Sequence, residues 1–205
     1  MKKVLLGAGL VLIAASAGGA VWLTQFSEPE DQFAGCSASN AGSAEIGGSF
    51  TLVDEGGETV TDEDVITKPS LVYFGYTFCP DICPLDNWRN AEAVTLLEER
   101  GVEAQPVFIS IDPQRDTPEV VGEFTDLFHP DMVGLTGSPE QVDAASKVYR
   151  TYYKAHDPEE DDYYLVDHTT YTYLVLPEHG FVEFFRREAT AEEMAGRVEC
   201  FVSRL

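Results

Sequence analysis

Basic residues, cysteines and histidines are all scarce in this sequence, and each shortage narrows the possible functions. Lys and Arg together number 13 against 36 Asp and Glu, so the 205-residue chain carries a formal net charge of −23. A surface this negative repels phosphate backbones, which argues against a nucleic-acid partner. The four cysteines include one closely spaced pair and no second one, so a four-thiolate zinc site is not available. No internal repeat is evident.

Charged residues are absent from one long segment near the N-terminus, and this absence predicts a membrane anchor. Val4 to Leu23 is apolar over about the length of a helix that crosses a bilayer. Lys2 and Lys3 precede it and acidic residues follow it, which places the N-terminus in the cytoplasm. We therefore predict residues 1–23 as a single-pass transmembrane helix in the cytoplasmic (inner) membrane, with the rest facing the periplasm. A signal sequence cleaved near Ala15-Ser16-Ala17 is the alternative, and it reaches the same compartment.

The remainder of the chain divides into a polar linker and one domain. Residues 24–45 are rich in Ser, Asn, Gly and acidic residues without periodicity, which is typical of a linker. Over residues 46–205, short apolar runs alternate with amphipathic segments, and residues 171–176 and 181–185 form a hairpin pattern. This order predicts an α/β fold and is compatible with a thioredoxin-like sheet with flanking helices, although other α/β topologies fit the pattern as well.

The close pair, Cys79 and Cys83, lies between a predicted buried strand and a predicted helix that ends at Gly101. Open α/β sheets bind ligands at such turns, and a helix N-terminus favours the thiolate form of cysteine. Two thiolates one helical turn apart can converge on one soft ion, and they favour Cu(I). An added imidazole gives a site that also accepts Cu(II). A disulfide between the two cysteines is the alternative at this spacing.

A third ligand has to come from one of four histidines, and residue type alone does not choose among them. His129 precedes a proline at a predicted helix end, His156 borders an acidic loop, and His179 lies in the hairpin turn. His168 directly precedes an apolar strand, and we expect the neighbouring Asp167 to orient its ring. His168 is the favoured ligand, with an ordinary surface histidine as the alternative.

The remaining cysteines, Cys36 and Cys200, lie near opposite ends of the predicted domain. Disulfides persist in the oxidising compartment predicted for this domain, so we expect these two to form a structural disulfide. Lipidation of Cys36 is the alternative, because Phe33-Ala34-Gly35-Cys36 is similar to a lipobox. The acidic residues between this segment and the apolar run argue against it.

Three separated motifs resemble the Sco/SenC family of copper proteins. They are YFGYTFCPDICP, FISIDPQRDTPE and LVDHTTYTYLV, in this order after an N-terminal anchor. The resemblance implies a thioredoxin-like fold, with copper bound by Cys79 and Cys83 as sulfur ligands and by His168 as nitrogen ligand. It further implies a role in building the binuclear copper site of cytochrome c oxidase. We interpret the DPQRDT stretch, residues 112–117, structurally, as a turn followed by a helix cap.

Three functions follow for this site. The first is a copper metallochaperone that delivers copper to the cytochrome c oxidase subunit carrying the binuclear site, with another copper chaperone as a further partner. The second is an enzyme, a thiol–disulfide oxidoreductase that uses Cys79 and Cys83 as a redox-active pair to reduce the cysteines of that site. The sequence lacks the Trp-Cys-x-x-Cys pattern usual in such reductases. The third is a peroxide-reducing or redox-sensing domain, and we expect this protein to show little peroxide-reducing activity.

Overall fold

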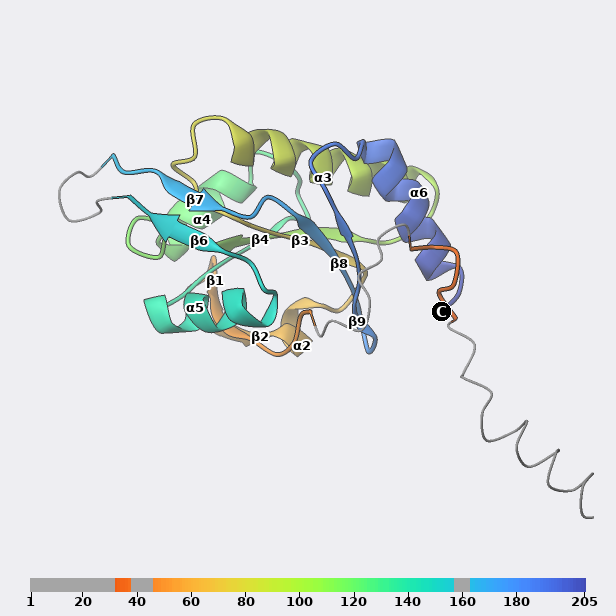
Figure 1. Cartoon of the computed structure of the whole chain (residues 1–205), viewed down its shortest axis with the longest axis horizontal. Coiled ribbons are helices and arrows are strands. Elements are labelled where there is room, and N and C mark those ends of the chain that lie inside the picture. Colours follow the sequence, from red (N-terminus) through yellow and green to blue (C-terminus); the bar gives the residue numbers. More distant parts are fainter. Residues whose placement is uncertain (1–31, 38–45, 157–162) are drawn as a thin grey trace, which may run out of the picture. The chain divides into compact units, whose positions relative to one another are not determined.

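A computed structural model describes residues 32–37, 46–156 and 163–205 (Figure 1). Its centre is a seven-stranded mixed sheet. In the order in which they lie side by side, the strands are β2 (Thr59–Thr61), β1 (Thr51–Asp54), β5 (Val133–Thr136), β4 (Gln105–Ser110), β3 (Ser70–Gly75), β8 (Thr172–Leu176) and β9 (Gly180–Phe185). Strands β3, β4 and β5 run parallel, whereas β8 and β9 are antiparallel to their neighbours. Every residue of β3 and β4 is buried, as expected for strands covered on both faces.

Helices cover both sides of this sheet. They are α2 (Asp62–Val65), α3 (Ile82–Glu99), α4 (Pro118–Thr125), α5 (Pro139–Val148) and α6 (Ala191–Val202). Helices α3 and α6 pack against each other on one side, and α5 lies on the other (Figure 1). A parallel β–α–β unit, β3–α3–β4, beside the antiparallel hairpin β8–β9 followed by α6 is the core of a thioredoxin-like sheet, which confirms the predicted fold class.

Local capping signals position the helix starts as predicted. The side chains of Thr117, Ser138 and Thr190 each accept a hydrogen bond from a backbone N–H in the first turn of α4, α5 and α6. The ends differ from the prediction, because α5 stops at Val148 rather than near residue 152. Arg150 adopts a left-handed backbone with φ 52°, which a continuing helix does not allow.

Four short elements were not predicted from the sequence. Strand β2 and helix α2 follow β1, and a separate two-stranded sheet pairs β6 (Tyr153–Ala155) with β7 (Val166–His168). Each has three or four residues, which is too few to show a hydrophobic period. The β6–β7 pair matters for function because His168 is its last residue.

Several predictions fall on residues outside the described ranges. These are the anchor at 1–23, most of the linker at 24–45 and the acidic loop at 157–162. Within the described residues, none of the helices has both the length and the apolar character that crossing a membrane requires. The anchor and the domain boundaries therefore stay predictions.

Cys36 and Cys200 are joined by a disulfide in the structure. Their Cα atoms are 5.6 Å apart, although the two residues are 164 positions apart in the sequence, so the bond closes a long loop. Cys36 is buried, and Cys200 belongs to α6. The bond therefore fixes the N-terminal end of the domain to its last helix, and it leaves the sulfur of Cys36 unavailable for lipidation.

Replacing Cys36 and Cys200 together by Ala should lower the free energy of unfolding by about 4–5 kcal/mol, because closing so long a loop removes much entropy from the unfolded chain. Urea unfolding of the oxidised proteins measures this difference. Reductant should destabilise the wild type to a similar extent and leave the double variant unchanged. A wild-type midpoint that does not respond to reductant would contradict a stabilising role for the bond.

Candidate metal centre

The turn from β3 to α3 carries both free cysteines. Strand β3 ends at Gly75, and α3 begins at Ile82, so Cys79 lies in the turn and Cys83 in the first helical turn. Pro84 is tolerated there because the backbone N–H groups of the first helical turn have no intrahelical acceptor. Proline, which has no N–H, therefore costs the helix no hydrogen bond at this position. The backbone N–H of Cys83 donates to the Sγ atom of Cys79 over 3.3 Å. The positive end of α3 thus faces this sulfur directly.

Gly75 makes room for the buried sulfur. A Cβ atom at this position would lie 3.1 Å from the Sγ atom of Cys83 and 2.8 Å from the ring of Tyr73. Contacts this short are incompatible with a side chain, so the close approach of Cys83 to β3 requires glycine. Cys83 has no exposed surface, while 8% of Cys79 is exposed.

His168 reaches the cysteines from the end of β7. Its Nε2 atom lies 3.4 Å from the Sγ atom of Cys83, and the three potential ligand atoms of Cys79, Cys83 and His168 all lie within 4.8 Å of one another. The Nδ1 atom of His168 lies 2.9 Å from the backbone oxygen of Thr169. Donation to that oxygen leaves the lone pair of Nε2 directed at the sulfurs, the form of imidazole that binds a metal.

The predicted role of Asp167 in orienting this ring is wrong. Adjacent residues of a strand point to opposite faces, so the carboxylate of Asp167 faces away from the ring of His168. It pairs instead with the Nε2 atom of His156 across the β6–β7 sheet, at 2.7 Å. Edge-on contacts from Tyr73 and Tyr76 flank the ring of His168, with centroids at 6.1 and 5.9 Å.

The other histidines lie apart from the cysteines. His129 is buried near Glu98, His156 pairs with Asp167, and His179 lies exposed in the β8–β9 turn. Among the residues that the structure describes, the three-residue group at Cys79 is also the one cluster of His, Cys, Asp and Glu with metal-binding geometry.

The two thiols differ in proton affinity. A hydrogen bond from the Cys83 side chain, supported by His168 and by the backbone N–H groups of Cys83 and Asp81, lowers the pKa of Cys79 to about 3 against the opposing effect of burial. Burial and the neighbouring Cys79 raise the pKa of Cys83. The metal-free site therefore holds a thiolate at Cys79 and a thiol at Cys83. Binding of a cation would remove the second proton, since metals bind the thiolate.

The DPQRDT stretch has a larger role than the predicted turn and cap. Asp116 is fully buried and accepts hydrogen bonds from the backbone N–H and the hydroxyl of Thr77 and from the hydroxyl of Ser110. Burial raises the pKa of Asp116. Thr77 is two residues before Cys79, so this buried carboxyl group fixes the turn that carries the first cysteine.

Arg115 connects this turn with the segment that carries the histidine. Its guanidinium group binds Asp112, donates to the backbone oxygen of Tyr164 and lies over the ring of Tyr164 at 3.6 Å. It also lies 4.7 Å from the centre of the Phe78 ring. Phe78 directly precedes Cys79, and Tyr164 is four residues before His168. Asp112 and Arg115 are therefore positioning residues, and their arrangement depends on contacts between distant segments that the local sequence does not reveal.

One side of the candidate centre borders a pocket of about 450 Å³. Cys79 and His168 line it together with apolar residues near them in the sequence, among them Ile82, Leu165 and Val166. Cys83 is not among the lining residues. An ion at this centre would be held by Cys83 on its buried side. Another molecule could reach the ion through the pocket, past Cys79 and His168.

Alkylation of Cys79 should depend little on pH in the reduced, metal-free protein. Because its pKa is lowered to about 3, the thiolate fraction stays high down to about pH 5, whereas an ordinary thiol of pKa about 8.5 loses reactive thiolate about tenfold per pH unit. Iodoacetamide labelling followed by peptide mass spectrometry measures the rate at each cysteine. Cys83→Ala should remove the stabilising side-chain hydrogen bond and restore pH dependence. A wild-type rate that falls tenfold per unit below pH 8 would contradict the assignment.

Comparisons with known proteins agree with this geometry. The SCO1/SenC family matches residues 38–203. Protein SenC of Rhodobacter capsulatus is 58% identical over 176 residues, which cover 85% of this chain and 79% of that protein. The mitochondrial SCO1 homolog 1 of Arabidopsis thaliana is 43% identical, and the matched region spans 48% of its length.

A solved structure shares the fold as well. The crystal structure of Arabidopsis thaliana ScoI with copper bound superposes with a TM-score of 0.72 at 40% identity, covering 77% of this chain and 99% of that one. The family match covers most of the chain, and it includes both the cysteine turn and the histidine segment. This chain belongs to the SCO1/SenC family.

Proposed function

We propose that this protein is a copper metallochaperone that holds the ion with Cys79, Cys83 and His168. The observation that carries the proposal is the convergence of two sulfurs and one imidazole nitrogen within 4.8 Å of one another. Thiolate and imidazole are soft and borderline ligands, a set that suits Cu(I) and extends to Cu(II). The copper-bound state of the Arabidopsis relative supports the same ion.

The recipient that we propose is the binuclear copper site of cytochrome c oxidase, the role that membership of this family implies. Copper would pass by ligand exchange rather than as a free ion. Cys79 borders the pocket, so a thiolate of the recipient can approach the ion while Cys83 still holds it. We further propose that a second copper chaperone loads the site, and that the predicted N-terminal anchor holds the domain at the periplasmic face of the inner membrane.

Reconstitution with Cu(I) should give about one copper per chain, because the three ligands form a single soft site. Cys79→Ala and Cys83→Ala should each abolish this copper, while His168→Ala should weaken it, and weaken Cu(II) binding most. Metal analysis after gel filtration and the sulfur-to-copper charge-transfer band of the Cu(II) form measure these effects. His179→Ala is the matched control, since this histidine is exposed and distant from the cysteines, and it should bind copper normally. Full copper retention by Cys79→Ala would eliminate the site.

A thiol–disulfide oxidoreductase is the second candidate, and the state of the two cysteines favours it. Cys79 and Cys83 are both free, and the lowered pKa of Cys79 makes it a ready nucleophile. In this reaction the Cys79 thiolate attacks a partner disulfide, and Cys83 then displaces the partner from the mixed disulfide, so the partner is reduced and the Cys79–Cys83 pair oxidised. A cellular thiol reductant would have to restore the reduced pair.

The variant His168→Ala separates the two functions. Copper binding needs the imidazole as a ligand. In disulfide exchange His168 only assists Cys83 in stabilising the Cys79 thiolate, so a reductase should keep most of its rate in this variant. The rate is measured with a peptide that carries the two cysteines of a copper site joined as a disulfide. Two results together would favour the enzyme over the metallochaperone. Reduction would persist in His168→Ala and disappear in Cys83→Ala, and the wild type would retain copper poorly.

A further inference from the structure

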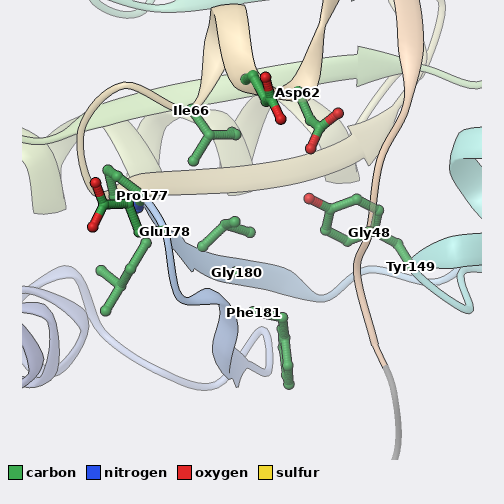
Figure 2. A pocket seen from close by; sticks show the side chains of 11 residues that line it. Gly48, Asp62, Ile66, Tyr149, Pro177, Glu178, Gly180 and Phe181 are labelled. Atoms are coloured by element: carbon green, nitrogen blue, oxygen red, sulfur yellow. The ribbon is translucent and has the colours of Figure 1, made fainter.

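A second pocket lies at the end of the sheet opposite the candidate metal centre. Ser70, where β3 begins, pairs with Val175 near the β8–β9 turn, whereas the cysteines follow the other end of β3. The pocket has a volume of about 240 Å³ (Figure 2). Its lining residues are Gly48, Asp62, Glu63, Ile66, Tyr149, Val175, Leu176, Pro177, Glu178, Gly180 and Phe181.

The charges that line this pocket are all negative. Asp62 and Glu63 come from α2, and Glu178 comes from the β8–β9 turn. The lining includes no Lys, Arg or His, and none of these three carboxylates forms an ion pair with another residue in the described ranges. Acidic residues at the start of a short helix have an ordinary structural use, and Asp62 does accept a hydrogen bond from the backbone N–H of Phe50. Stabilising the start of α2 does not explain Glu178, because Glu178 lies in the β8–β9 turn.

Tyr149 supplies independent evidence that the pocket takes a ligand. Only 2% of this residue is exposed, yet its hydroxyl points into the pocket (Figure 2). No hydrogen-bond partner for this hydroxyl is found among the residues that the structure describes. The hydroxyl group of a tyrosine whose ring is buried usually has a hydrogen-bond partner. A ligand donor in the pocket would provide one.

The lining decides which cation fits. A metal ion needs ligand oxygens that converge, and among the described residues these carboxylates do not form such a cluster. The walls combine these polar groups with apolar side chains, among them Ile66, Val175 and Phe181. Such a pocket suits a charged head on a hydrocarbon stem, whose N–H groups can donate to carboxylates and to the phenol oxygen. We propose that this pocket binds a primary alkylammonium group, either of a free amine or of a lysine side chain on a partner protein.

The backbone at Glu178 makes a decisive variant possible. Glu178 has φ 63°, a left-handed conformation that Asn tolerates better than Glu. Glu178→Asn therefore removes the carboxylate without straining the turn, and the variant should fold at least as well as the wild type. Glu188→Asn is the matched control, because Glu188 is also an exposed turn glutamate but follows the far end of β9 and lies outside the pocket.

Titration of the full-length, detergent-solubilised chain with n-butylammonium tests the proposal, with the amide signals of Gly180 and Phe181 followed by NMR. The signals should shift saturably with the amine and not with butan-1-ol, its neutral counterpart. Glu178→Asn should raise the Kd about tenfold, since a charge-assisted contact is lost, and Tyr149→Phe about threefold. Glu188→Asn should change it less than about twofold, as expected for a remote exposed charge. A parallel titration with N-acetyl-lysine amide identifies the source: tighter binding of this probe than of butylammonium assigns the site to a partner lysine, and tighter binding of butylammonium assigns it to a free amine.

Three outcomes would overturn the proposal: no saturable shift with either amine, equal binding of butan-1-ol, or equal weakening by Glu188→Asn and Glu178→Asn. The proposal does not rest on the copper function. The titration should give the same result in a Cys79→Ser background, so failure of one proposal leaves the other standing.

Discussion

The antiparallel register of β8 on β3 is the constraint on which the candidate metal centre depends. Tyr73 pairs with Thr172. The segment that follows β3 toward Cys79 therefore lies at the same end of the sheet as the segment that runs from His168 into β8. Nothing in the local sequence brings these segments together. A slip of one residue would shift the histidine segment by about 3.3 Å and turn the side chains of β8 to the opposite faces. Because β8 is buried throughout, such a slip is costly, and the fold itself thereby fixes the position of His168.

Two buried contacts extend this control from the strands to the loops. Asp116 holds the cysteine turn through Thr77, and Arg115 joins Phe78 beside that turn to Tyr164 on the histidine segment. Asp116 and Arg115 both follow β4, the parallel neighbour of β3, whose carboxyl end lies at the same end of the sheet. Strand pairing thus places the two segments at the same end of the sheet. The contacts of Asp116 and Arg115 then fix the two loops, and the loops position the sulfur and nitrogen atoms.

Much of this could be predicted from the sequence wherever the signal is local. Thr117, Ser138 and Thr190 each cap a helix because the capping bond spans only three residues. The error at Asp167 shows the limit, since the carboxylate lies beside His168 in sequence but on the opposite face of a strand too short to be recognised. The bracing by Arg115 was missed for a different reason. Its partner Tyr164 lies 49 residues away, and no single-sequence pattern reports such a contact.

The geometry of the candidate centre has a consequence for how an ion would leave. The three potential ligand atoms lie within 4.8 Å of one another on packed elements of the fold, so an ion bound there would contact all three together. Contact with three ligands at once makes spontaneous dissociation slow. Release then requires a competing ligand, and the difference in exposure between the sulfurs determines where that ligand enters. Cys83 is closed off behind Gly75 and Tyr73, whereas Cys79 borders the pocket, so exchange can begin only on the side of Cys79 and His168.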